Sequence, residues 1–320
     1  MSVPAESPPP RRARRWIQVA ATALALAATV RLVGAKPLLA RLHGLDPDWV
    51  AVGLLITAVQ LILLAARWWF VALRLGLPLS FRRALGEYYL SSLLNNFLPL
   101  SGDALRAFRH AERAKVGAER PFMPVVSAIL LERASGQLAL FLTVVIVAPG
   151  LLREISGKTG VLERSVVAIV VVGLIGAAWF VGKRWFGRFY AAAAAGGRVL
   201  LLPSNLLVHL PISLALVATH VTLFIVGASS IGLELPFATG IRVVPPVLLA
   251  ASVPAFVAGF GMREAAAATL YHLMGLGAAD GAAISIAYGS ISLLGSLPGV
   301  ITLAWRHRHA TTHPSRAGRP

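Results

Sequence analysis

The sequence contains no cysteine and few acidic residues. Among its 320 residues, 13 Asp and Glu stand against 30 Lys and Arg, and charged residues make up only 13% of the chain. The lack of cysteine excludes disulfides, thiolate zinc sites, iron–sulfur clusters and a cysteine nucleophile. Soluble domains carry roughly 25% charged residues, so this chain has too few charges to cover a water-exposed surface.

The sequence is rich in long runs of apolar residues. Apolar residues make up 57% of the chain, and the mean hydropathy is +0.74. Runs close to the ~20 residues of a spanning helix lie near residues 16–30, 49–66, 124–148, 165–182, 207–231, 243–260 and 281–304. The sequence therefore predicts an all-α polytopic transmembrane helix bundle with about 7–8 membrane segments.

The basic residues concentrate at both ends and in alternate loops. Residues 1–15 and 306–320 are expected to be disordered basic tails around a transmembrane domain of residues 16–305. The net charge of +17 would indicate nucleic-acid binding in a soluble protein. In a membrane protein, Lys and Arg instead gather in cytoplasmic loops and attract anionic lipids. We therefore expect a cell-membrane protein with cytoplasmic termini, a lipid partner and no nucleic acid.

One apolar segment, residues 84–100, is flanked by basic residues on both sides. Arg82 and Arg83 precede it, and Arg106 and Arg109 follow it. Both flanks favour the cytoplasm, so the segment is predicted to enter and leave the membrane at the same face. Irregular backbone at membrane depth is stable only when it is buried in protein or lines a wet cavity. A re-entrant segment here therefore predicts a cavity.

A second interrupted segment, residues 245–277, contains Pro245, Pro246 and Pro254. Two interrupted apolar segments, one in each half of a chain, are typical of a transporter's binding site. The sequences FLPLSGD and FVAGFG, which lie near the two breaks, share a loose pattern. An internal inverted repeat is one explanation of that pattern, and chance similarity is the other.

Asn95, Asn96, Asp103 and Arg106 form a first group of candidate binding residues. Arg106 lies three residues after Asp103, so the two can pair on one helical face. The group is either a capped helix with a surface salt bridge or a polar mouth that binds a phosphate head group.

Glu132 and Arg133 form a second group, inside the run at 124–148. Neighbouring residues of a helix point about 100° apart, so each is expected to need a partner on another element. Charged residues in a spanning segment cost free energy and indicate function by default, with a structural ion pair between helices as the alternative. We expect Glu132 to pair with a basic residue, and Arg133 with an acidic one or with lipid phosphate.

Gly259, Gly261, Arg263 and Glu264 form a third group. Glycine lets the backbone approach a ligand, and a helix that begins near Met262 would offer free N–H groups to an anion. Arg263 adds a positive charge suited to phosphate. The alternative is a tight turn from which Arg263 reaches the membrane interface.

Three stretches resemble the transmembrane region of lysylphosphatidylglycerol synthases, also called the flippase-like membrane family. They are LLNNFLPLSGDALRAFRHAERA, SAILLERASGQLALF and PAFVAGFGMREAAAATLYHLMGLGAADGAAISIAYGSISLLGSLPGVI, and the resemblance runs from about residue 50 to 305. It implies a bundle with re-entrant elements that moves lipids between leaflets. Members fused to a soluble aminoacyl-transferase domain make and flip aminoacylated phosphatidylglycerol.

The chain ends soon after its last predicted helix, so we expect neither that soluble domain nor enzyme activity. Stand-alone relatives are associated with glycolipids, polyprenyl-linked sugars and hopanoids, which leaves the substrate open. The first motif has Leu100-Ser101 where relatives often have Gly or Arg. The resemblance therefore does not imply that this chain binds the same lipid head group as those relatives.

Two other function classes fit parts of the sequence. Asp46-Pro47-Asp48 lies on a loop predicted to face outward, where a membrane glycosyltransferase would bind a metal and a lipid-linked sugar phosphate. Asp46 would otherwise cap the helix that begins near Trp49. A non-catalytic partner of an envelope-synthesis complex is the third class. The sequence has no P-loop and no paired metal spacing of histidines, so we expect no cofactor, no metal and no direct use of ATP.

The expected function is translocation of an anionic or glycosylated envelope lipid. The head-group phosphate would be contacted by three arginines, Arg106, Arg133 and Arg263. Those arginines would be held by, or exchange with, three carboxylates, Asp103, Glu132 and Glu264. An envelope-synthesis enzyme as a partner and self-association both stay open.

Overall fold

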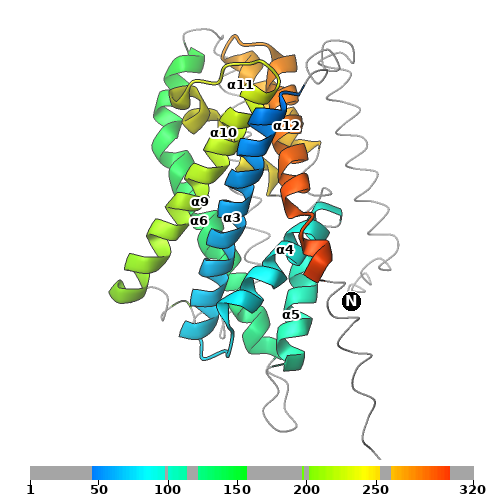
Figure 1. Ribbon diagram of the computed structural model, residues 1–320. Coiled ribbons are helices and arrows are strands. Elements are labelled where there is room, and N and C mark those ends of the chain that lie inside the picture. The colour runs from blue at the N-terminus through cyan, green and yellow to red at the C-terminus, as the bar shows by residue number, and fades with distance from the viewer. Residues whose placement is uncertain are drawn as a thin grey trace, which may run out of the picture.

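The computed structural model describes residues 45–97, 100–113, 122–156, 197, 202–252 and 261–302, and its elements in these ranges are helices (Figure 1). They are α3 (Pro47–Arg74), α4 (Phe81–Phe97), α5 (Ser101–Arg113), α6 (Phe122–Ser156), α9 (Pro203–Ser230), α10 (Phe237–Ala251), α11 (Met262–Leu273) and α12 (Ala278–Ser296). The predicted all-α class is confirmed. The predicted runs at 16–30 and 165–182 and both basic tails lie outside the described residues, so the number of membrane segments stays a prediction.

Four of the described helices, α3, α6, α9 and α12, are long and apolar enough to cross a membrane. They match the runs predicted at 49–66, 124–148, 207–231 and 281–304. Large apolar side chains lie exposed on them, among them Leu55 at 67%, Ile146 at 77% and Leu207 at 77%. An exposed apolar surface of this kind is stable in lipid rather than in water.

The start of α3 follows from its capping residues. The Asp46 carboxylate accepts a hydrogen bond from the Asp48 backbone N–H at 2.8 Å, and Pro47 fills the first turn. Both are favoured at a helix start, where the first N–H groups have no partner within the helix. Asp46 therefore has the capping role that the sequence allowed as the alternative to a metal site.

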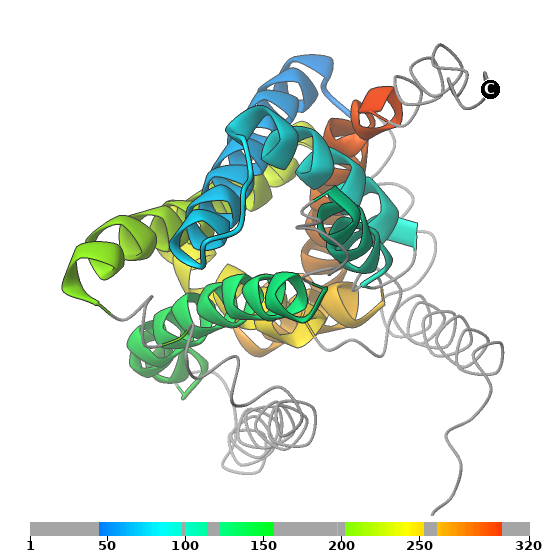
Figure 2. The same ribbon diagram turned by 90° about the horizontal axis from the view of Figure 1, so that it is seen from below.

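Helices α4 and α5 form a hairpin at the end of the bundle where α3 ends and α6 begins (Figure 1). Figure 2 shows the same bundle from below, with this hairpin at the near end. The two helices pack closely, because a Cβ at Gly102 would lie 2.0 Å from the Ser91 carbonyl oxygen. The segment predicted to turn back at 84–100 forms only the first arm of the hairpin, since α4 continues to Phe97 and the chain returns through α5; entry and exit at one membrane face stay a prediction. Arg106 and Arg109, which were among the basic residues flanking the segment, lie buried in the outgoing helix α5, at 1% and 8% exposure.

Helices α10 and α11 form a second hairpin at the opposite end of the bundle (Figure 1). Its arms run from 237 to 251 and from 262 to 273, where the sequence predicted an interrupted segment at 245–277. Pro245 and Pro246 lie inside α10, and α11 begins after Gly261, whose φ of 86° suits glycine. Gly259 lies outside the described residues.

The two halves of the bundle have the same order of elements and run in opposite directions. α3 and α9 have 28 residues each and are antiparallel neighbours, since the Asp46 N–H donates to the Ser230 carbonyl at the start of one and the end of the other. In both cases the second residue after the helix is a glycine with φ near 70°, Gly76 at 72° after α3 and Gly232 at 71° after α9. A hairpin and a long helix then follow in both halves. The described helices thus have the arrangement of an inverted repeat, while FVAGFG lies outside the described residues except for Gly261, so the explanation of the sequence pattern stays a prediction.

Candidate functional site: an arginine-lined cavity between two hairpins

A cavity of about 400 Å³ lies between the two hairpins and the long helices. Its wall takes residues from α3, α4, α6, α9, α10, α11 and α12. Among the described residues, the lining includes three arginines and no Asp or Glu. The polar and charged side chains that bear on its chemistry are Arg67, Tyr88, Asn95, Asn96, Arg133, His220, Arg263 and Tyr288.

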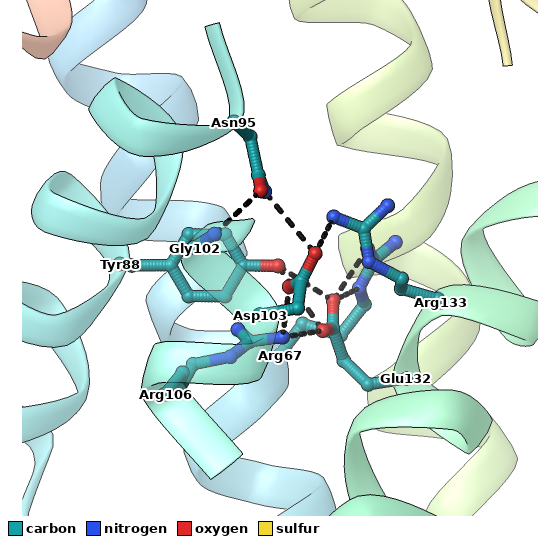
Figure 3. A network of polar contacts seen from close by, with 8 residues as sticks. All are labelled: Arg67, Tyr88, Asn95, Gly102, Asp103, Arg106, Glu132 and Arg133. Carbon is teal, nitrogen blue, oxygen red and sulfur yellow. Dashed lines mark hydrogen bonds and ion pairs between the residues drawn. The ribbon is translucent and has the colours of Figure 1, made fainter. Parts of the chain in front are cut away.

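Glu132 is the centre of the polar network that Figure 3 shows. Its carboxylate has no exposed surface and accepts hydrogen bonds from Arg67 Nε at 3.0 Å, Arg106 at 3.1 Å and the Tyr88 hydroxyl at 2.9 Å. These donors come from α3, α5 and α4. The expectation that Glu132 pairs with basic residues on other helices is confirmed.

Asp103 is the second carboxylate of the network and binds Arg133 of α6 (Figure 3). It also accepts from Arg106 at 3.0 Å and from the Asn95 amide at 3.1 Å. The same Asn95 accepts from the Gly102 backbone N–H at 2.9 Å, so one side chain joins both arms of the hairpin. The expected pairs Asp103–Arg106 and Arg133–acidic residue are therefore both present.

Arg106 lies behind the cavity wall rather than on it. Its side chain is 0% exposed, and its guanidinium lies 4.6 Å from the Trp68 ring and 4.5 Å from the Tyr88 ring. Two aromatic faces and two carboxylates hold the guanidinium in place. This geometry fixes α5 against its neighbours and does not present Arg106 to a ligand. The phosphate contact expected of Arg106 is not what the structure shows.

The network carries one positive charge in excess, since the guanidinium groups of Arg67, Arg106 and Arg133 face the carboxylates of Asp103 and Glu132 (Figure 3). We call these five residues and Tyr88 the Glu132 cluster. An uncompensated charge away from water costs free energy. The side chain of Arg133 is 40% exposed, and it lines the cavity together with Arg67. The excess positive charge of the cluster is therefore presented to the cavity through Arg67 and Arg133.

Arg263 contributes the third guanidinium of the wall. It donates to Glu264 at 2.7 Å and to the Ser285 hydroxyl at 2.9 Å, and it lies 5.0 Å from the Tyr288 ring. The other Glu264 oxygen accepts from the Gly261 N–H at 2.5 Å. The helix start that was expected to offer free N–H groups to an anion is thus partly satisfied by its own glutamate. The positive charge offered to the cavity comes from the Arg263 side chain.

Several residues of the site were missed by the sequence analysis. Arg67 lies just outside the apolar run predicted at 49–66, although the apolar stretch WWFVAL directly after it indicates that the helix continues. His220 is a titratable residue inside a predicted span, which is itself an indicator of function. Gly136 makes room for Arg67, because a Cβ there would lie 2.7 Å from a guanidinium nitrogen.

The sequence-predicted residues thus divide into two layers. The cavity wall takes Asn95, Asn96, Arg133 and Arg263. The layer behind it holds the charged partners Asp103, Arg106, Glu132 and Glu264. Gly261 begins α11.

The comparison with protein families gives one match. The family model described as lysylphosphatidylglycerol synthase TM region matches residues 15–299. No curated protein matches the chain.

Proposed function

The chain belongs to the lysylphosphatidylglycerol synthase TM region family, a premise from which we propose that it moves an anionic or glycosylated envelope lipid across the cell membrane. The chemistry is binding and release, with no bond in the lipid made or broken. The observation that carries the proposal is the two-layer wall. Guanidinium groups face the cavity, while the carboxylates that orient them stand behind and do not repel an anion directly.

Phosphate is the head-group chemistry that this wall fits best. Arg67 and Arg133 approach the cavity from one side of the bundle and Arg263 from the other half. Guanidinium groups bind phosphate oxygens through paired N–H donors, and such charge-assisted hydrogen bonds are stronger than neutral ones. The Asn95 and Asn96 amides line the same cavity and supply neutral donors and acceptors for glycerol or sugar hydroxyls.

The inverted repeat supports exchange between two access states. One hairpin enters from each end, and the cavity lies between them, as in transporters whose binding site lies at a repeat interface. Movement of α4–α5 would open the cavity to one leaflet, and movement of α10–α11 to the other. A gradient or a downhill lipid distribution supplies the free energy in this proposal.

The basic connection between α3 and α4 supports a cytoplasmic position for the α4–α5 end. Arg74 at the end of α3 and Arg82 and Arg83 in the first turn of α4 flank this connection, and basic residues gather on the cytoplasmic side. The second repeat has fewer basic residues at its corresponding end, where Arg242 is paired with Glu154 at 2.7 Å.

Lipid co-purification tests the proposal directly. The protein, Arg263→Gln and the control Arg242→Gln would be purified from native membranes, and the bound lipids identified by mass spectrometry. Arg242 is a matched control because it also pairs with a glutamate but lies off the cavity. We expect one phosphate-bearing lipid class to be enriched in the wild type and in the control, and lost in Arg263→Gln.

Transport itself is measured next with a fluorescent analogue of the enriched lipid in proteoliposomes. Flux without a sugar donor or metal supports translocation, and metal-dependent turnover of a lipid-linked sugar supports a glycosyltransferase instead. Bulk lipid alone in all three preparations contradicts the proposed site.

A further inference from the structure

His220 is a titratable side chain in the middle of the spanning helix α9, and it lines the cavity. Its Nδ1 lies 2.9 Å from the Gln60 amide nitrogen and 2.8 Å from the Tyr288 hydroxyl. These partners come from α3 and α12, so the ring joins both halves of the inverted repeat. Lipid binding by the arginines does not by itself require an imidazole at this position.

The hydrogen bonds allow the ring both of its protonation states. With the amide nitrogen and the hydroxyl donating, Nδ1 accepts, and the neutral ring carries its proton on Nε2. A proton added to Nδ1 finds an acceptor in the Tyr288 oxygen, and rotation of the Gln60 amide presents its carbonyl oxygen instead.

The charges around the ring change with the occupancy of the cavity. The groups that face or share its cavity are Gln60, Arg67, Tyr88, Arg133, Arg263 and Tyr288. Three of them are guanidinium groups, which repel a further positive charge in a cavity that holds no anion. A bound phosphate brings the opposite charge within a few ångströms, where charges interact strongly in a poorly solvated site.

A polar stripe on α9 leads from His220 toward the start of the helix. Ser213 lines the cavity and His209 lies one turn before it, at 2% and 6% exposure. In the described part of the chain, neither ring nitrogen of His209 nor the Ser213 hydroxyl has a hydrogen-bond partner. His209 stacks on Phe70 near the end of α3, which is the end with the α4–α5 hairpin. Buried polar atoms of this kind bind ordered water, and such water along the stripe would connect His220 with that face.

We propose that His220 takes up a proton when the anionic head group binds, so that anion and proton occupy the cavity together. The proton comes from a hydronium ion of the aqueous phase: one hydronium O–H bond breaks, leaving water, as the Nδ1–H bond forms. When the anion leaves, the Nδ1–H bond breaks and the proton returns to water. No bond in the lipid changes. The inference rests on the proposed function, since it needs an anion in the cavity. It makes a proton gradient the source of free energy for transport.

Calorimetry of anion binding tests the proton uptake. A short-chain phosphatidylglycerol is the probe, because its phosphodiester keeps one negative charge across neutral pH, and any proton taken up belongs to the protein. Titrations at pH 7 in buffers of different ionisation enthalpy give the number of protons bound per lipid. We expect a positive proton number that approaches one per lipid in the wild type, since one proton is the upper limit for a single coupled group.

Three variants complete the experiment. His220→Gln is expected to bind the lipid with about zero proton uptake, while His272→Gln, an exposed histidine of α11, keeps the wild-type number. Tyr288→Phe, which retains the ring stacked on Phe224 but lacks the hydroxyl acceptor, takes up fewer protons at pH 7.

The outcomes separate the two proposals. Lipid binding without proton uptake in the wild type, or equal uptake in His220→Gln, overturns the role of His220 and leaves translocation standing. If none of the protein preparations gives a heat of lipid binding, anion binding itself is overturned, and the proton inference is overturned with it. The wild-type proton number needs no variant, so a folding defect in His220→Gln does not remove the test.

Discussion

Replacement of Glu132 by glutamine measures how strongly the cluster depends on its carboxylates. Glu132 is fully buried and accepts hydrogen bonds from Arg67, Arg106 and Tyr88. Glutamine keeps the shape of the side chain but removes its charge, so three guanidinium groups then face the Asp103 carboxylate alone. Removing one partner of a buried ion pair costs about 3–5 kcal/mol. We expect the free energy of unfolding to fall by that amount.

Glu154→Gln is the matched control for this measurement. Glu154 also pairs with an arginine, Arg242 at 2.7 Å, but its side chain is 28% exposed and that of Arg242 is 38% exposed. Exposed pairs contribute about 0–1 kcal/mol. Unfolding of both variants would be followed by tryptophan fluorescence in mixed micelles of a mild detergent and dodecyl sulfate. An equal loss in the two variants would refute the argument that the Glu132 cluster is shielded from water.

The same variant has a second, charge-specific readout. Loss of Glu132 adds one positive charge to a cluster that already carries one in excess, so a bound anion should stabilise Glu132→Gln more than the wild type. Short-chain phosphatidylglycerol is the anion, and a neutral short-chain diacylglycerol is the control ligand. Equal stabilisation of the two proteins by the anion would contradict a cluster that attracts anions by its net charge.

Two further predictions use other features of the bundle. Gly136→Ala should displace the Arg67 guanidinium, since the new Cβ would lie 2.7 Å from one of its nitrogens. The amount of lipid that co-purifies with the protein should fall, with little change in expression. An unchanged lipid content would contradict the role of Arg67. The chain has no cysteine, so the single variants Ser80→Cys and Glu234→Cys report directly on orientation. Both positions are exposed, in the connections that precede the two hairpins. An impermeant maleimide added to whole cells should label Glu234→Cys and not Ser80→Cys. Labelling of Ser80→Cys alone would contradict the proposed topology and invert it.

Hydropathy and charge predicted much of this architecture, because both follow from the solvent. Apolar runs located the four described spanning helices, and basic residues on both sides of 84–100 indicated a segment that turns back. The adjacency of Glu132 and Arg133 required partners on other helices, and the structure supplies them from α3 and α5. Each of these inferences depends on local sequence and on the cost of charge in lipid.

The division of charges between wall and support could not be predicted in the same way. In the sequence Arg67 directly follows an apolar run and Arg106 follows Asp103 by three residues. Only the packing of α3, α4 and α5 shows that Arg67 lines the cavity while Arg106 lies between Trp68 and Tyr88. Hydropathy places residues in or out of the membrane. It carries no information about which side of a buried arginine faces a neighbouring helix.

The two hairpins place a carboxylate behind a cavity-lining arginine in the same way. Asp103 is the third residue of α5 and Glu264 the third residue of α11, and each helix begins after a residue with positive φ, Leu100 at 65° and Gly261 at 86°. Each carboxylate binds a guanidinium of the cavity wall, from Arg133 in one case and Arg263 in the other. Under the proposed function, an anion in the cavity would compete with the carboxylate of either hairpin for an arginine. A ligand shifts a conformational equilibrium only through its different interactions with the two states, and this competition is the interaction by which a phosphate head group would loosen one hairpin or the other.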